Sequence, residues 1–215
     1  MLYIVSTPIG NLEDISFRAV RILKEASVIV CEDTRRTSKL LRHYEIPKKK
    51  LIVYTDYNKQ KVIPKIIEIL KTEEVAFVSD NGTPCVSDPG FQLVRECVKQ
   101  DIQVVPVPGP SAMLAGLVAS GLATDKFTFM GFFPKKGNKG IDEIKKSDHT
   151  LIFYDSPHRI VKTLKKLSGI CPDKQIVIAR ELTKKFEEFI RGSVLEVYDA
   201  IKDRTMKGEI VFLIK

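Results

Sequence analysis

The sequence contains no tryptophan, and only 8% of its residues are aromatic. A surface that binds single-stranded nucleic acid by stacking bases on many rings therefore has little support. The four cysteines form no CxxC pair and the three histidines lie far apart, so the sequence indicates neither a zinc site nor a redox motif. We expect reduced thiols and no bound metal.

Long hydrophobic runs are also lacking. The longest apolar runs have the length of a strand, so we expect no segment that spans a membrane and no membrane partner. The first residues run straight into a strand without a basic leader, which predicts a cytoplasmic protein. With 44% hydrophobic and 29% charged residues among 215, the composition is typical of a soluble globular protein with one large domain or two small ones.

Apolar β-branched runs alternate with helical periodicity through the first half. This pattern predicts a largely parallel sheet with helices on both faces. We expect strands at 2–6, 28–31, 51–54, 75–79 and 103–106, and helices at 16–25, 36–44, 62–72, 91–100 and 111–120.

The second half predicts another α/β domain. We expect strands at 127–131, 150–155, 175–179, 186–191 and 209–213, and helices after the basic loop 134–140, at 156–167 and at 194–202. Ser156 before Pro157 predicts a helix start, and Ser193 with Glu196 has the spacing of a capping box. The predicted fold is two α/β domains, with a mainly parallel sheet in residues 1–122 and a mixed sheet in residues 123–215.

Positive charge is concentrated in the second half. Residues 1–125 hold 16 Lys and Arg against 15 Asp and Glu, whereas residues 126–215 hold 19 against 12. The second half thus carries +7 of the net charge of +8. This asymmetry suggests an anionic partner, with nucleic acid as the first candidate. The alternative is a lysine-rich solvated surface.

Three loops rich in Gly and Pro follow predicted strands of the first half. They are TPIGN at 7–11, SDNGTPCVSDPG at 79–90 and VPVPGPSA at 105–112. Gly and Pro hold the backbone in shapes that few other sequences reach, and the carboxyl ends of parallel strands meet at one edge. We expect these loops to form a ligand cleft, although ordinary turns also favour such residues. Neither GxGxxG nor GxxxxGK[ST] occurs, so the dinucleotide and P-loop fingerprints are missing.

Charged side chains also follow buried strands at 32–36, 155–159 and 179–185. Arg159 is the strongest candidate, because a guanidinium binds phosphate or carboxylate in a bidentate manner. His158 could move a proton, but a histidine at a helix end is more often structural or solvated. Solvated charge runs are the alternative for all three segments.

Seven motifs occur in an order that resembles one known family. They are TPIGNLEDIS, CEDTRRT, SDNGTPCVSDPG, VVPVPGPSA, GFFPKKG, DSPHR and ARELTKKFEE. This order resembles the ribosomal RNA small subunit methyltransferase I family of the tetrapyrrole methylase superfamily. The resemblance implies a homodimeric, S-adenosylmethionine-dependent enzyme that methylates the ribose 2′-OH of a cytidine in the decoding centre of 16S rRNA, within the small ribosomal subunit.

The resemblance also implies the roles of individual residues. The methyl donor is expected in a cleft between the domains, lined by Pro8, Asp80, Gly82, Thr83, Pro84, Val86, Gly109, Ser111, Ala112, Tyr154 and Leu182. The polar groups expected in catalysis are Asp33, Arg35, Arg159, Glu181 and Lys184. The residues expected to contact RNA phosphates are Lys135, Lys136, Lys139 and Lys185.

This sequence departs from the family pattern at Asn81, where Ala is usual, and at Asp155, where Glu is usual. Many members also continue into a short helical carboxyl-terminal extension beyond the position of Lys215. If that extension helps to grip RNA, either the basic second half must do more here or this chain binds RNA more weakly. Two other functions stay open: a methyltransferase of the same superfamily that acts on a corrin precursor, and a non-catalytic RNA-binding module.

Overall fold

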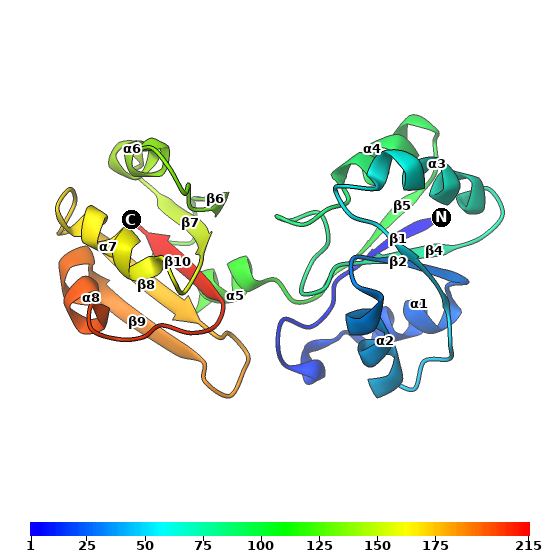
Figure 1. The fold of residues 1–215 in the computed structure, drawn as a ribbon, viewed down its shortest axis with the longest axis horizontal. Helices are drawn as coiled ribbons and strands as arrows, with labels where there is room; N and C mark the ends of the chain where they lie inside the picture. Colours follow the sequence, from blue (N-terminus) through cyan, green and yellow to red (C-terminus); the bar gives the residue numbers. More distant parts are fainter. The chain divides into compact units, whose positions relative to one another are not determined.

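The computed structural model describes residues 1–215, which divide into two compact units, Met1–Ser111 and Ala112–Lys215 (Figure 1). Each unit is an α/β structure built on one five-stranded sheet, as the sequence predicts. No helix combines the length and the apolar character needed to cross a membrane.

The sheet of the first unit is entirely parallel, with strand order β3-β2-β4-β1-β5. Its strands are β1 (Leu2–Val5), β2 (Val28–Cys31), β3 (Lys50–Val53), β4 (Val75–Val78) and β5 (Val104–Val107). β1 lies between β4 and β5, so the loops that follow these three strands emerge side by side.

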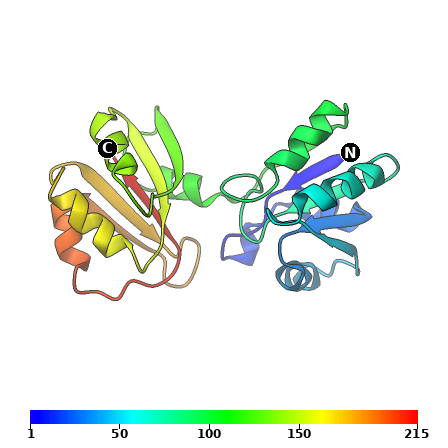
Figure 2. The ribbon, with the colours of Figure 1, turned by 45° about the horizontal axis from the view of Figure 1, so that its top comes forward.

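Helices cover both faces of this sheet because successive strand residues point to opposite sides. One core joins the sheet to α1 (Phe17–Glu25) and α2 (Thr34–His43), and a second core joins it to α3 (Lys59–Leu70) and α4 (Phe91–Lys99). Figures 1 and 2 show these two pairs on opposite sides of the sheet. A short 3-10 turn, η1 (Leu12–Asp14), precedes α1.

β5 forms one edge of the first sheet. Pro106 lies within this strand, opposite Ile4 of β1, and has no N–H to donate. The Pro106 carbonyl accepts a hydrogen bond from the guanidinium of Arg18 on α1.

The sheet of the second unit is mixed, with strand order β6-β7-β10-β8-β9. Only β6 and β7 run parallel. The strands are β6 (Phe127–Phe132), β7 (Thr150–Asp155), β8 (Gln175–Arg180), β9 (Glu188–Ser193) and β10 (Ile210–Ile214), and the helices α5 (Ala112–Val118), α6 (Lys139–Lys146), α7 (Ile160–Ser168) and α8 (Val194–Ile201).

The two faces of β10 explain how these helices are arranged. Ile210, Phe212 and Ile214 belong to a core that contains side chains from α6, α7 and α8. Val211 and Leu213 point the other way, toward Gly116 of α5. α5 therefore belongs to the second unit, and the boundary along the chain falls after Ser111. The sequence-based boundary at 122/123 counts this helix with the first domain. The local sequence pattern does not reveal that α5 packs against β10, which lies far along the chain.

The capping box at Ser193 is confirmed, since Ser193 Oγ accepts from Glu196 N and the Glu196 carboxylate accepts from Ser193 N. The predicted start of α7 at Ser156 is wrong. The helix begins at Ile160, after a turn in which Ser156 Oγ accepts from the backbone N of His158. Asp155, the last residue of β7, pairs with Arg159 across this turn.

Candidate active site

Hydrogen bonds tie the three Gly- and Pro-rich loops of the first unit together. Thr7 N donates to Gly82 O at 2.9 Å, and Gly82 N donates to Thr7 O at 3.1 Å. Thr83 Oγ1 donates to Pro110 O at 3.0 Å and lies 3.0 Å from Ser6 Oγ, which is then the donor to Thr83. The loops after β1, β4 and β5 therefore form one connected edge, as the sequence predicts.

Two glycines make this close approach possible. Gly82 has a φ of +78°, and a Cβ at this position would lie 3.1 Å from Ile9 Cγ2. A Cβ at Gly109 would lie 2.9 Å from Ser6 Cβ, closer than side chains normally come. Any other residue at either position would push one loop away from its neighbour.

A pocket of about 330 Å³ opens on this edge. Its walls come from the loops after β1 and β4 and from one side of α2. The lining residues are Thr7, Pro8, Gly10, Leu12, Arg36, Thr37, Lys39, Leu40, Ser79, Asp80 and Asn81. Of the residues expected to hold a cofactor, Pro8 and Asp80 line this pocket. Gly82, Thr83 and Gly109 belong to the loop connections instead, Pro84 is buried and Val86 is half-buried.

Asp80 connects this pocket to the start of α2. Its Oδ1 accepts from the backbone N of Asp33 at 3.1 Å, and its Oδ2 lies 3.5 Å from Nε of Arg36. Asn81 completes the group when its amide is oriented to satisfy both its polar atoms, because its oxygen then accepts from Arg36 at 3.3 Å. Asn81, one of the departures from the family pattern, is thus part of a polar network.

Asp33 and Arg35 form a separate pair, in which Asp33 is half-buried and Arg35 is exposed. Asp33 caps α2 by accepting from Arg35 N at 2.8 Å, and its Oδ2 lies 2.8 Å from Arg35 Nη2. The Arg35 side chain, by its hydrogen bonds, lowers the pKa of Asp33 to about 2. Arg35 is 88% exposed and does not line the smaller pocket; it lines a second concavity of about 640 Å³ along α2. One step along a helix turns the side chain by about 100°, so Arg36 and not Arg35 faces the pocket beside Asp80.

Two carboxyl groups at this edge lie in segments that the sequence singled out, 32–36 and 79–90, but were given no individual role. Glu32 follows β2 directly, and burial, together with the charges of Asp88 and Asp80, raises its pKa to about 7. Its Oε1 is buried without a hydrogen-bond partner. Burial also raises the pKa of Asp88 to about 6. The signal available in the sequence was the position of Glu32 immediately after an all-buried strand, one residue before Asp33.

The candidates of the second unit fall into two groups. The first surrounds Asp155, which is buried and accepts from Ser156 N at 2.7 Å, from Thr163 Oγ1 at 2.9 Å and from the Arg159 guanidinium. Arg159 also donates to Phe133 O at 3.2 Å. Tyr154 is half-buried, with its ring centroid 4.9 Å from that of Phe129.

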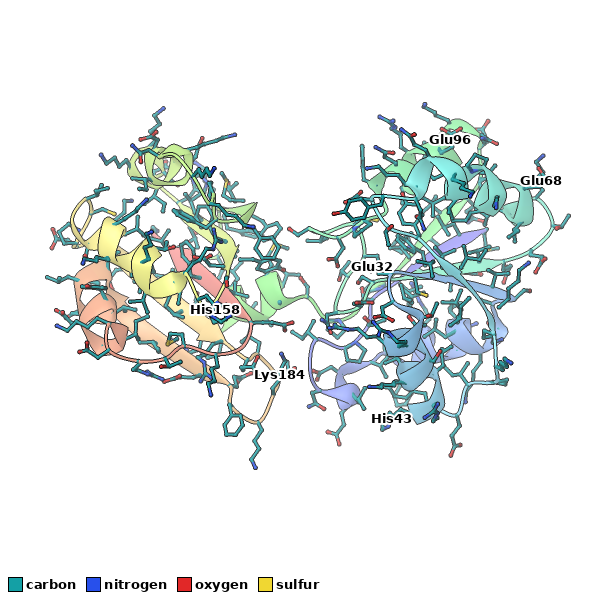
Figure 3. All side chains as sticks on the ribbon, viewed as in Figure 1. Glu32, His43, Glu68, Glu96, His158 and Lys184 are labelled. Carbon is teal, nitrogen blue, oxygen red and sulfur yellow. The ribbon has the colours of Figure 1, made fainter.

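The second group lies on the loop between β8 and β9, where Figure 3 labels Lys184. Lys184 Nζ lies 3.0 Å from Glu181 Oε1 and 2.9 Å from Glu209 Oε2. Burial would lower the pKa of Lys184, but the hydrogen bonds to Glu209 and Glu181 outweigh it and raise the pKa. Leu182, between the two charged residues, is buried.

The remaining candidates lie apart from these groups. Ser111 ends the first unit and Ala112 opens α5 in the second. The four lysines expected to contact RNA are exposed, three of them around the start of α6 and one on the β8–β9 loop: Lys135, Lys136, Lys139 and Lys185. No group of three or more His, Cys, Asp or Glu side chains is placed to hold a metal ion.

Comparisons with known proteins match nearly the whole chain. The family described as Tetrapyrrole (Corrin/Porphyrin) Methylases matches residues 1–198. The Ribosomal RNA small subunit methyltransferase I of Hydrogenobaculum sp. (strain Y04AAS1) is 49% identical, over 99% of this chain and 94% of that protein. The protein of the same name from Thermotoga maritima is 43% identical, over 99% of this chain and 97% of that protein.

Solved structures agree on the fold. A diphthine synthase superposes with a TM-score of 0.75 at 15% identity, covering 99% of this chain and 88% of that one. A cobalt precorrin-4 methyltransferase superposes with a TM-score of 0.70 at 16% identity, covering 99% and 93%. The fold and the resemblance inferred from the ordered motifs are confirmed, and the chain belongs to the tetrapyrrole (corrin/porphyrin) methylase family.

Proposed function

We propose that this chain is an S-adenosylmethionine-dependent methyltransferase that modifies the ribose 2′-OH of a cytidine in the decoding centre of 16S rRNA. The observation that carries the proposal is identity of 49% along almost the whole of both chains to a Ribosomal RNA small subunit methyltransferase I. Similarity of that extent includes the loops and not only the core that any member of the fold requires.

The three connected loops at the carboxyl ends of β1, β4 and β5 fit the methyl donor. Gly82 and Gly109 leave room for the backbone of adjacent loops to meet, and the pocket beside them offers both the Asp80 carboxylate and the apolar side chains of Leu12 and Leu40. S-adenosylmethionine, when bound, supplies a methyl group already activated on a sulfonium. The chain then has to bind and orient, and alignment alone can supply about 7–11 kcal/mol of the barrier.

The remaining residues expected to hold the donor keep that role in the proposal, with Tyr154 and Leu182 contributed by the second unit. Five charged residues keep their proposed catalytic role, which is to position the substrate. All five form ion pairs in the structure: Asp33, Arg35, Arg159, Glu181 and Lys184. A carboxylate with a pKa of about 2, such as Asp33, is a poor proton acceptor near pH 7. Glu32, with a pKa of about 7, is better matched to accept the proton of the 2′-OH.

The substrate is proposed to be the assembled small ribosomal subunit in the bacterial cytoplasm, and the active species a homodimer. The net charge of +7 in residues 126–215 and the four exposed lysines support contact with RNA phosphates. Neutralising these lysines should weaken binding to RNA of any sequence.

The test is transfer of labelled methyl groups from S-adenosylmethionine to small subunits that lack decoding-centre methylation, followed by mapping of the labelled nucleotide. Label on one cytidine ribose establishes donor, substrate and reaction together. Donor binding without transfer to subunits, but with transfer to a tetrapyrrole, would assign the chain to the small-molecule methyltransferases instead. If S-adenosylmethionine causes no thermal shift, the chain is not a methyltransferase, and RNA binding alone would be left.

A further inference from the structure

The loop between β8 and β9, residues 181–187, has a shape fixed by its own hydrogen bonds. Lys184 N donates to Glu181 O, and Glu187 N donates to Lys184 O, each at 3.0 Å. Thr183 N donates to Glu187 Oε2 at 2.6 Å. Glu181 and Thr183 hold positive φ values of 51° and 66°, which non-glycine residues adopt only where the surroundings enforce them.

The loop is also attached firmly to the sheet. Leu182 is buried, and Lys184 bridges Glu181 to Glu209, next to the start of β10. Arg180 of β8 donates to the carbonyl of Phe186 at 3.4 Å. Figure 1 shows the loop reaching beyond the ends of β8 and β9, and Figure 3 labels Lys184 on it. The segment is therefore a rigid projection.

This rigid projection presents one aromatic ring and one cation to solvent. Phe186 is 65% exposed, and Lys185 Nζ lies 5.7 Å from the centroid of its ring. The neighbouring acidic side chains are engaged elsewhere: Glu181 with Lys184, Glu187 with Thr183 N, and Glu188 with arginines. Leaving a Phe ring in water forgoes the stabilisation of burying it, and the loop holds it there at that cost.

We propose that Phe186 stacks on an unpaired base of the substrate RNA and that Lys185 contacts an adjacent phosphate. The proposal rests on RNA being the substrate. Proteins that recognise RNA target unstacked bases in loops and at ends, and they hold these bases on aromatic side chains beside basic ones. A ring that is already ordered and exposed loses little conformational entropy when it stacks. The proposal requires only this one ring and is therefore compatible with the scarcity of aromatic residues.

The absence of tryptophan makes a direct test possible, because the F186W variant carries the only tryptophan of the chain. Its emission should be quenched when a short unstructured RNA oligonucleotide is added, and salt should reverse the quenching. F17W is the matched control, since Phe17 on α1 is 97% exposed in the other unit. Its emission should not change.

Affinity provides the second measurement. Loss of one base stack in F186L should weaken binding of the oligonucleotide by about 5- to 150-fold, whereas F186W should bind as tightly as the wild-type protein. K185Q should reduce the slope of log affinity against log salt by about 0.7, the value for one phosphate contact on a single strand. The thermal shift with S-adenosylmethionine should be unchanged in all three variants.

Unchanged F186W emission at saturating RNA, together with wild-type affinity in F186L, would overturn the proposal. A blue-shifted emission of F186W without RNA, with a dimer that dissociates in F186L, would instead place Phe186 between two copies of the chain and overturn it too. These results are separate from failure of the proposed function, which is measured by methyl transfer to small subunits. A wild-type chain that binds neither the oligonucleotide nor small subunits, and transfers no methyl group to them, would refute both.

Discussion

Glu32→Gln tests whether the carboxyl group at the end of β2 is held at a cost to stability. In the native state burial and the nearby charges of Asp88 and Asp80 raise its pKa from 4.5 to about 7, and its Oε1 has no hydrogen-bond partner. The native state therefore binds this proton more tightly than the unfolded chain does. It follows that the contribution of Glu32 to the free energy of unfolding falls as the pH rises from about 4.5 through about 7.

The size of the effect follows from the rise in pKa. At 1.36 kcal/mol per pH unit, the difference between 4.5 and about 7 corresponds to about 3 kcal/mol. Glu32 is only half-buried, so solvent screening reduces this to about 1–2 kcal/mol. Glu32→Gln removes the charge with little change in shape. The variant should be more stable than the wild-type protein by about that amount at pH 8–9, or roughly 3–6 °C in melting temperature.

Urea denaturation from pH 4 to pH 9 measures this difference. The variant and the wild-type protein should converge at about pH 4, below the unfolded-state pKa of 4.5, since Glu32 is then largely protonated in both states. Glu68→Gln is the control: this exposed carboxylate on α3 pairs with Lys71, and its removal should change stability little and equally at pH 5 and pH 9. A Glu32→Gln variant with a difference independent of pH, or one less stable than the wild-type protein at pH 9, would refute the reasoning.

Three further outcomes are expected. Gly109→Ala places a Cβ 2.9 Å from Ser6 Cβ, so it should separate two loops and weaken S-adenosylmethionine binding at least about tenfold by calorimetry; unchanged affinity would contradict the role of these loops. Asp155→Asn leaves Arg159 without its buried partner and should lower the free energy of unfolding by about 3–5 kcal/mol in urea, a loss that an exposed pair would not show. The last variant replaces four exposed lysines by Gln: Lys135, Lys136, Lys139 and Lys185. It should lower the slope of log RNA affinity against log salt by roughly 3, and an unchanged slope would show that these lysines do not contact RNA phosphates.

The sequence predicts best where a strand is buried on both faces. β2 and β7 have the predicted bounds, because short apolar runs bordered by charged or turn residues leave little choice of position. The first residue of a helix is harder to predict from the sequence. α3 begins at Lys59, before the predicted residue 62, and it accommodates Pro64 in its second turn. The position of α5 depends on β10, almost a hundred residues later in the chain, and no local pattern reveals such a partner.

The candidate site shows the same division. The edge on which the three loops meet follows from strand order and from their Gly and Pro residues. The sequence does not reveal which of the charged side chains on this edge is buried and which is solvated. Glu32 and Asp33 are neighbours of the same chemistry, yet burial raises the pKa of one to about 7 and Arg35 lowers that of the other to about 2. That contrast arises from the loop after β4, which the fold brings against Glu32 and not against the Asp33 carboxylate.

The edge strand β5 has a consequence for how copies of this chain can associate. An exposed edge of a parallel sheet is a template for a strand from another molecule, and long flat edges lead to aggregation. Here Pro106 removes one donor from the edge, and Arg18 occupies the carbonyl of the same residue. An incoming strand would find the hydrogen-bonding ladder interrupted near its centre. Joining of two copies into one continuous sheet through β5 is therefore disfavoured.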